Sequence, residues 1–450
     1  MEPLDPSWCW SRYEPSPAQP WNVGLAAHLY RRAAFGATTD ELRQAAKRGP
    51  RATLEDLLHA PAGWAHYDAA QAARETSGAR SGDSQAFQAW WLRRLIESPF
   101  PLLEKLTLFW HDHFSIGAAK TGDLALFQKH VQMVRAGALG NFGPLLGQLM
   151  DDPAMYVALD GDQNRRAQPN LTFARPWLRR FTLGTGVGTE QDIQGIARAF
   201  TGWFVYGGQL RFISREHDDG AWTILGRSGQ FGRDELLNVL VQHPVTALNL
   251  ARGLFRWFVS ETAVPGDELL RPLAESLRRS QTLREPLEMI LGSNIFYSRH
   301  AMSQRIKSPV DLAVGMARSM QTMLPGQALA RDLGNLGQRL DEPPTVQGWP
   351  TGCDWINTIT LAGRLRLSRD LVGGGGGYGK GVDLWRIAAD HGAKTTVDAV
   401  KLWLEVLVQD QPSSTAVQPI VAAATQTAAD PAAVSRAVSS IVSLPEFQIN

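Results

Sequence analysis

Helix-start signals recur along most of this 450-residue chain. Thr38-Thr39-Asp40-Glu41 has the form of a capping box, a hydroxyl followed three residues later by a carboxylate, and Thr189 and Asp192 repeat it. Asp430 precedes Pro431, the usual order of an N-cap and a first-turn proline. Apolar residues follow each signal at helical spacing. The pattern predicts a mainly α-helical protein.

These signals and the apolar periodicity predict the individual helices. Pro99 and Pro101 separate two of them, and Pro101 suits the first position of the second. We expect helices over residues 85–96, 101–114, 123–134, 189–200, 244–258, 269–279, 284–291, 308–323, 397–408 and 432–442.

One stretch has the pattern of strands instead. Residues 203–206 and 209–213 are short β-prone runs joined by Gly207-Gly208, and two glycines suit a tight hairpin because both turn positions can take positive φ. Residues 223–225 are a candidate third strand. The sequence therefore predicts a small antiparallel β insertion around 203–225 in a large helical domain.

The domain organisation follows from proline and glycine. Residues 1–24 contain several prolines and tryptophans, which predicts an extended strap lying on a domain surface. The glycine-rich segment 373–381 lacks the spacing of a phosphate-binding loop and is interpreted as a flexible surface loop. With no internal repeat and no clear linker, we expect residues 25–450 to form one domain.

Charge and composition exclude several classes of protein. Lys plus Arg number 45 and Asp plus Glu 44, so the formal net charge is +1, which argues against a nucleic-acid partner. Two cysteines are too few for a disulfide scaffold or a four-thiolate zinc site. The sequence has no apolar run long enough for a membrane span and no signal-peptide pattern, so the expected compartment is the cytoplasm.

The first chemically rich segment is Phe109-Trp110-His111-Asp112-His113-Phe114. Two histidines two positions apart lie about 200° apart around a helix, so they share a metal only if the helix ends by Trp110. Otherwise one histidine is a hydrogen-bonded core residue and the other lies at a helix C-terminus, where an imidazolium is favoured. Both interpretations are open. The pair beside Asp112 is the best candidate for ligand binding or acid–base chemistry.

A second segment, Glu216-His217-Asp218-Asp219-Gly220, follows the predicted hairpin. A histidine with carboxylates suits a divalent metal or a general base, whereas Asp-Asp-Gly is also ordinary turn chemistry. His111, His113 and His217 are therefore the candidate ligands of a divalent transition metal, the cofactor that these residues would suit. His113 and Asp218 are the candidate catalytic residues. Nothing in the sequence shows that these groups converge.

Two further segments are candidates for binding. Arg175 and Arg179 belong to a local basic cluster that could hold a phosphate or an acidic partner, or could be a solvated helix face. Trp349 and Trp355 lie in a proline- and glycine-rich loop of the kind that walls a pocket or packs on a core.

The segments just described, in this order, resemble the bacterial "domain of unknown function 1800" family. The matching stretches are HLYRRAAFGAT, LTLFWHDHF, PNLTFAR with RFTLG, TEQDIQGIARAFTGW, HDDGAWTILG, KSPVDLAVG, GQRLDEPPTVQGWP and LPEFQ. The resemblance implies a mainly helical protein with no established reaction. It also implies a protein partner, since members are often encoded beside a sulfatase-like family, and many relatives carry export signals.

The chain departs from the family pattern at five positions. Leu171, Pro176 and Arg179 stand where the family usually has three acidic residues, and Trp222 and Gln347 stand where it often has lysine. Neither proline nor arginine can ligate a cation or carry a proton as a carboxylate does.

These replacements leave two functions open. The sequence favours a non-catalytic or degenerate binding or scaffold subunit. The alternative is a metal-assisted or acid–base enzyme that uses a cluster of histidines and an aspartate, namely His111, His113, His217 and Asp218.

Overall fold

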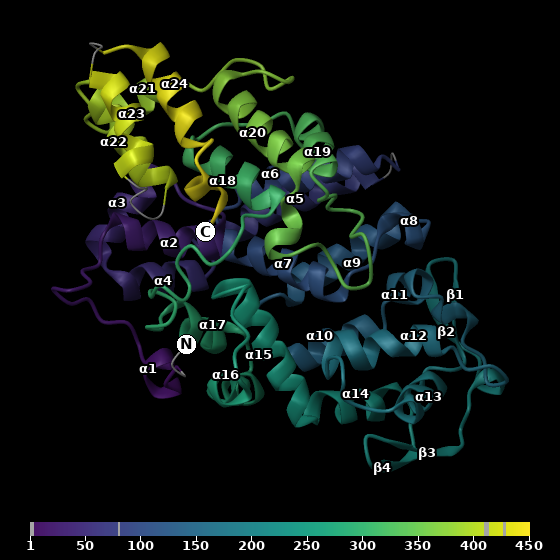
Figure 1. Ribbon diagram of the computed structural model, residues 1–450. Helices are drawn as coiled ribbons and strands as arrows, with labels where there is room; N and C mark the ends of the chain where they lie inside the picture. Colours follow the sequence, from purple (N-terminus) through teal and green to yellow (C-terminus); the bar gives the residue numbers. More distant parts are fainter. Residues whose placement is uncertain (1–3, 80–81, 409–413, 426–428) are drawn as a thin grey trace.

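The computed structural model describes residues 4–79, 82–408, 414–425 and 429–450. It is mainly α-helical with two small two-stranded antiparallel sheets, which confirms the predicted fold class (Figure 1). None of the helices within these residues is long and apolar enough to cross a membrane.

The first part of the chain supplies eleven of the described helices. They are α1 (Pro6–Trp10), α2 (Val23–Ala34), α3 (Thr39–Arg48), α4 (Pro50–Leu58), α5 (Trp64–Ala79), α6 (Ser84–Glu97), α7 (Pro101–Phe114), α8 (Ala118–Thr121), α9 (Leu124–Gly137), α10 (Phe142–Met150) and α11 (Pro153–Ala158).

The helices that follow α11 fall into two groups in the chain, three before the four strands and the others after them. They are α12 (Leu171–Pro176), the π-helical segment η2 (Trp177–Thr182), α13 (Glu190–Ala199), α14 (Arg233–Gln242), α15 (Pro244–Phe258), α16 (Asp267–Arg279), α17 (Arg284–Leu291), α18 (Pro309–Ser319), α19 (Gly326–Asn335), α20 (Thr358–Gly373), α21 (Leu384–Asp390), α22 (Thr396–Leu407), α23 (Ser414–Thr425) and α24 (Pro431–Ile441). Short 3-10 turns occur at Gly161–Gln163, Ser214–Glu216, Gly352–Trp355 and Pro445–Gln448.

The helix-start signals act as predicted. The Thr38 hydroxyl accepts a hydrogen bond from the Glu41 backbone N–H, and the Glu41 carboxylate accepts one from the Thr38 N–H. Thr189 and Asp192 form the same reciprocal pair at α13. Each satisfies backbone donors that the first turn of a helix leaves without a partner.

The β insertion contains four strands rather than the predicted three. β1 (Trp203–Tyr206) pairs with β2 (Gln209–Phe212), and β3 (Ala221–Ile224) pairs with β4 (Arg227–Gln230) in a second sheet. The turn between β3 and β4 uses Leu225 at φ 50 and Gly226 at φ 77. Because leucine rarely adopts this conformation, the second hairpin has no clear signal in the sequence.

The N-terminal segment is partly helical, which differs from the extended strap that we expected. Asp5 caps α1, and residues 11–22 then run outside regular helices and strands. Trp10 Nε1 donates to the Leu269 carbonyl at 2.6 Å, and Trp21 Nε1 donates to the Ala45 carbonyl at 2.9 Å. The tryptophans therefore attach the segment to α16 and α3.

The glycine-rich segment 373–381 packs back on itself. Gly374 ends α20 in the left-handed conformation, and Val382 N donates to Val372 O. The side chain of Tyr378 is buried, and its hydroxyl donates to Asp332 Oδ2 at 2.8 Å. The first of these hydrogen bonds joins the two ends of the loop, and the second attaches the loop to α19.

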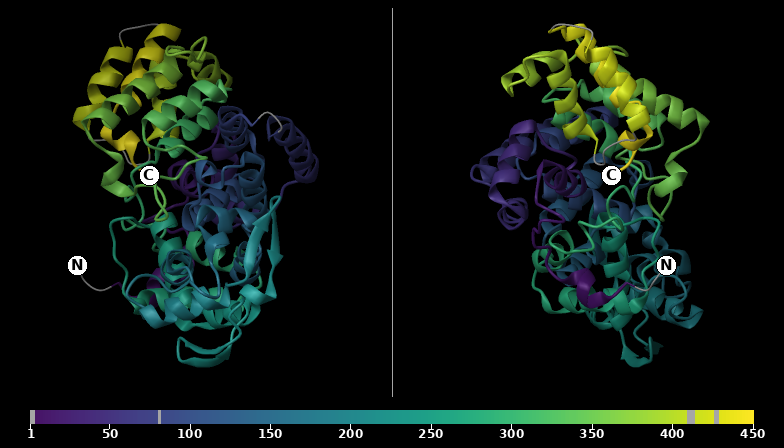
Figure 2. Two further views of the ribbon diagram at one scale, coloured as in Figure 1. Left: turned by 90° about the vertical axis from the view of Figure 1, so that its right-hand side faces the viewer. Right: turned by 60° about the vertical axis from the view of Figure 1, so that its left-hand side comes forward.

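One buried hydrophobic cluster runs from Cys9 to Phe447 and includes most of the helices. α7 contacts α2, α6, α9 and η2. The C-terminal helices α21–α24 lie at one end of the molecule and the two hairpins at the other (Figures 1 and 2). The assignment of residues 25–450 to a single domain stays a prediction.

Candidate functional site

A cavity of about 260 Å³ lies at the C-terminal end of α7, between η2, α15 and the loop 347–351. Its aromatic walls are Phe109, Trp257 and Trp349. Its charged and polar lining comprises Asp112, His113, Arg180, Arg256, Glu261, Arg305, Gln347 and Thr351. We call this cavity the Asp112 pocket.

The carboxyl of Asp112 lies close to a change of charge at neutral pH. Its Oδ1 accepts a hydrogen bond from Trp349 N at 2.7 Å, and its Oδ2 lies 3.6 Å from Arg180 Nη2. Burial raises the pKa of this carboxyl to about 6, although Arg180 and the Trp349 N–H act in the opposite direction. A carboxyl with such a pKa can exchange a proton near physiological pH.

Gly348 brings the loop against Asp112. It has φ +88, and a Cβ built there would overlap the Asp112 carboxylate, with Cγ at 2.8 Å. Only glycine combines this backbone conformation with so close an approach. The Gly-Trp-Pro motif therefore lets the backbone cover one oxygen of Asp112.

The π-helical segment η2 positions Arg180. Its wide turn is closed by Leu183 N, which donates to Leu178 O at 2.9 Å. Arg180 Nε donates to His113 O at 3.2 Å and Nη2 donates to Asp112 O at 3.0 Å. A guanidinium at the carbonyl end of α7 satisfies acceptors that the helix leaves free. π-bulges occur often at functional sites.

Two other arginines line the pocket, and they differ in burial and in whether they form an ion pair. Arg305 forms a buried ion pair with Glu261 at 2.7 Å. Arg256 is exposed, its Nη2 donates to Thr351 Oγ1 at 3.1 Å, and it has no ion pair within the described residues. Three arginines and two carboxylates give the lining a net charge of +1 with histidine neutral. Among the described residues, Arg180 and Arg305 each form an ion pair with a carboxylate of this lining, and Arg256 does not.

The histidines of α7 lie on different sides of the helix, because α7 continues to Phe114. His111 Nε2 donates to Leu340 O at 2.9 Å, and His113 Nε2 donates to Phe181 O at 3.1 Å. Burial lowers the pKa of each imidazole to about 3, so both are neutral at pH 7. Of the two, only His113 lines the Asp112 pocket.

His217 and Asp218 follow β2 and do not line the Asp112 pocket. His217 Nδ1 donates to Thr201 O at 2.9 Å, and Asp218 Oδ2 lies 3.8 Å from Arg198. Across the residues that the structure describes, no group of three or more His, Cys, Asp or Glu side chains is placed to hold a metal ion. The structure therefore does not bring His111, His113 and His217 together, and these residues do not fit a divalent transition metal.

The remaining candidates lie in different places. Arg175 and Arg179 both bind the Glu190 carboxylate, with Arg175 making two hydrogen bonds of 2.7 and 2.9 Å. Trp355 is buried and does not line the Asp112 pocket, whereas Trp349 does.

The positions that depart from the family pattern lie mostly outside this pocket. Leu171, Pro176 and Arg179 do not line it, and Gln347 does. Trp222 stacks under the Arg198 guanidinium at 3.3 Å.

The sequence did not identify most of the pocket. The sequence indicates Asp112 only as a neighbour of the histidines, and Arg180 only as a member of the basic cluster that includes Arg175 and Arg179. No local motif in the sequence singles out Arg256, Glu261 or Arg305. One signal in the sequence is the proline- and glycine-rich loop that contains Trp349, for which the sequence leaves both a pocket wall and packing on the core open.

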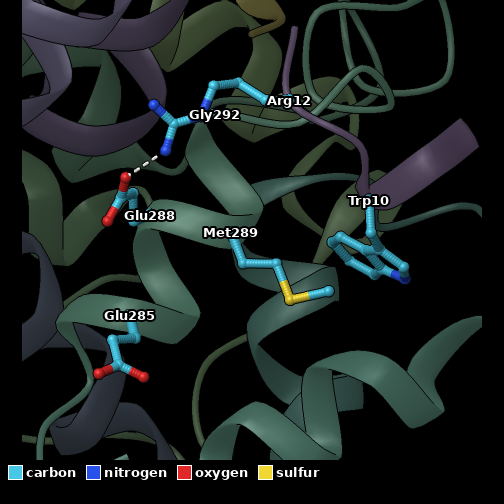
Figure 3. Close-up of a pocket in the computed structure, with 6 residues that line it drawn as sticks. All are labelled: Trp10, Arg12, Glu285, Glu288, Met289 and Gly292. Carbon is cyan, nitrogen blue, oxygen red and sulfur yellow. Dashed lines mark hydrogen bonds and ion pairs between the residues drawn. The ribbon is translucent and has the colours of Figure 1, made fainter. Parts of the chain in front are cut away.

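A second cavity, of about 240 Å³, lies where the N-terminal segment meets α17. Figure 3 shows Trp10 and Met289 on one side, with Arg12 reaching Glu288 at 2.6 Å and Glu285 standing apart. Arg12 and Glu288 are both substantially exposed, so their pairing adds little stability. This cavity lies between the N-terminal segment and α17, and its cation, Arg12, is already paired with Glu288.

The fold and this pocket define a mainly helical protein whose central helix ends in a half-buried carboxylate surrounded by arginines. The chain belongs to the family described as "Protein of unknown function (DUF1800)", whose model matches residues 28–449. This match confirms the resemblance identified from the sequence. No curated protein and no solved structure matched the chain.

Proposed function

We propose that this protein is a non-catalytic binding subunit that holds a small anionic ligand in the Asp112 pocket. The observation that carries the proposal is Arg256, a cation on the pocket wall with no carboxylate partner among the described residues. Its planar guanidinium suits a carboxylate, phosphate or sulfate group, which it can bind through two hydrogen bonds.

The rest of the lining supports an anionic ligand of modest size. The net charge of +1 favours an anion, and the aromatic walls reduce the exposure of the site to water. A volume of about 260 Å³ is at the lower end for ligand pockets, so a small molecule fits better than a polymer.

An acid–base enzyme is the second candidate, and the Asp112 carboxyl favours it. With a pKa of about 6, this group could act as general acid or base near neutral pH. Arg256 would then orient an anionic substrate. In such an enzyme Asp112 would be the acid–base group, in place of the histidine cluster expected from the sequence.

Calorimetric titration of the purified full chain with sodium sulfate and with sodium phosphate tests the binding function. Arg256→Gln removes the guanidinium charge and should weaken sulfate binding by roughly tenfold or more, the effect of a lost charge-assisted hydrogen bond. Arg252→Gln is the matched control, because Arg252 lies one turn earlier on α15 and pairs with Asp267 outside the pocket. It should leave sulfate binding unchanged.

Equal sulfate affinity in the wild type and Arg256→Gln, or no heat of binding for either anion, would contradict an anion site. Turnover of phosphate or sulfate esters that is lost in Asp112→Asn, while sulfate binding persists, would favour the enzyme instead.

The partner and compartment also belong to the proposal. We propose a protein partner such as a sulfatase-like enzyme, as the family resemblance implies, and a cytoplasmic location. Co-purification with a sulfatase-like protein encoded nearby tests the partner, and detection of the mature protein outside the cytoplasm would contradict the location.

A further inference from the structure

One residue on the wall of the Asp112 pocket has no side chain. Gly253 lies in the interior of α15, where glycine is less stable than alanine because it loses more backbone freedom on folding. A glycine inside a helix therefore needs a reason in the backbone conformation, in the packing or in the function of the site.

Neither the backbone nor the packing requires glycine at position 253. Its φ is not positive, so other residues can adopt the same conformation. Among the described residues, a Cβ built there would meet only the Phe109 ring, with Cζ at 3.7 Å, which is ordinary van der Waals contact. By contrast, a Cβ at Gly195 of α13 would lie 2.6 Å from Ile224 Cγ1. Close packing therefore explains Gly195 and does not explain Gly253.

The missing side chain leaves room on the pocket wall beside a cation and two aromatic rings. Arg256 and Trp257 follow Gly253 by three and four residues, so the three positions share one face of α15. Side chains on a helix lean toward its N-terminus, which directs Arg256 and Trp257 over the turn that contains Gly253. All three residues line the pocket together with Phe109 of α7.

The aromatic part of this wall is held in place by its neighbours. The rings of Phe109 and Trp257 meet edge to face, with their centres 5.6 Å apart, and Phe109 is buried. The Arg305 guanidinium lies 5.1 Å from the centre of the Trp257 ring, and its ion pair with Glu261 fixes it there. A wall that is ordered before binding gives an apolar group a surface at low entropic cost.

The cation beside this wall suits a singly charged group. Arg180 and Arg305 each pair with a carboxylate of the lining, and Arg256 forms no ion pair among the described residues. One guanidinium matches one planar carboxylate through two hydrogen bonds.

We propose that the ligand of the Asp112 pocket is a monocarboxylate with a flat apolar body. The body lies over Gly253 against Phe109 and Trp257, and the carboxylate binds Arg256. This inference rests on the proposed function, because it needs the anion site at Arg256, and it adds the chemical class of the ligand.

Calorimetric titration of the purified full chain with sodium benzoate and with sodium acetate tests the ligand class. Both anions carry one carboxylate, and only benzoate has a ring to place over Gly253. Benzoate should bind tighter than acetate by roughly tenfold or more, because the pocket removes the apolar area of the ring from water. Sodium sulfate, titrated into the same preparation, reports on the anion site alone.

Two substitutions at Gly253 test the role of the open wall. Gly253→Leu fills the space beside Phe109 and should abolish the difference between benzoate and acetate. Gly373→Leu is the matched control and should keep it, because Gly373 ends α20 outside the pocket and a Cβ there would meet nothing within 4 Å. Gly253→Ala should raise the melting temperature, by about 1 °C, since alanine favours the helix and fits without overlap.

The possible failures are distinguishable. If sulfate binds but benzoate binds no tighter than acetate, the ligand class is wrong and the proposed function stands. If none of the three anions binds, both are wrong. A lower melting temperature for Gly253→Ala than for the wild type would show that packing requires this glycine and would overturn the inference. The wild-type titrations decide the ligand class even if Gly253→Leu does not fold.

Discussion

The backbone N–H of Trp349 donates to Oδ1 of Asp112 across 2.7 Å, although the two residues are 237 positions apart in the chain. This hydrogen bond attaches the loop 347–351 to the end of α7 and closes one wall of the Asp112 pocket. The loop can approach because Gly348, between Gln347 and Trp349, has no Cβ.

Gly348→Ala should displace this loop. The substitution combines the strain of a positive φ, about 1–2 kcal/mol, with an overlap against the Asp112 carboxylate. Gly337→Ala is the matched control, because Gly337 has φ +91 but a Cβ there would meet only Trp355 at 4.0 Å. We expect a lower melting temperature for Gly348→Ala than for Gly337→Ala, with weaker sulfate binding in Gly348→Ala alone. Equal losses in the two variants would show that close approach to Asp112 is unimportant.

Asp112→Asn should change how stability depends on pH. The pKa of Asp112 is about 6 in the native protein against 3.8 in its ordinary state, so the native state favours the proton. The wild type therefore loses stability as pH rises through 4 to 6, by up to about 3 kcal/mol, and the variant does not. The difference between their unfolding free energies in urea should grow over this window in favour of the variant and become constant above pH 7.

The wild type and Asp112→Asn share their other titrating groups, including the buried histidines. Subtracting one curve of unfolding free energy against pH from the other therefore removes the contributions of those groups. Asp267→Asn, which removes an exposed carboxylate paired with Arg252, is the control for loss of a negative charge. Parallel curves for Asp112→Asn and the wild type would contradict the raised pKa.

His111 and His113 should stay neutral across the physiological range. Their pKa values are lowered to about 3, and each Nε2 carries the proton that it donates to a backbone carbonyl. Nitrogen-15 NMR of the imidazoles should show the Nε2–H tautomer for both, with no titration between pH 5 and 8. Titration of either histidine near pH 6.5 would contradict the lowered pKa values, and a shift of the resonances on addition of Zn²⁺ would restore the metal interpretation of this segment.

Local signals were enough to predict many of the helices. α15 and α17 begin and end where the sequence placed them, and the caps at Thr38, Thr189 and Asp430 are present. A capping residue and an apolar stripe act within a few residues, so both can be recognised in a single sequence. The candidate strand at residues 223–225 overlaps β3, but the sequence does not predict β4, because the turn between them places Leu225 at a positive φ.

The candidate site depends on contacts between distant segments, which a single sequence does not record. Asp112, Arg256 and Trp349 come from α7, α15 and a loop, and none has a local pattern that points to the others. The position at which α7 ends also decides which of its side chains reach the pocket. Ser115, at φ 24, ends the helix after both histidines rather than before them. That position separates His111 from the pocket and leaves the aspartate between the histidines as its acidic group.

Sulfate binding should strengthen as Asp112 gains a proton. Protonation removes one of the two negative charges from the lining and raises its net charge from +1 to +2. Because sulfate itself stays a dianion, its dissociation constant should fall by roughly tenfold, about 1.4 kcal/mol, between pH 7.5 and pH 5. Asp112→Asn should bind sulfate tightly at both pH values, and Arg256→Gln should bind weakly at both. The dissociation constant of the wild type is measured by calorimetry at both pH values. If it does not change with pH, the charge of Asp112 does not act on the bound sulfate.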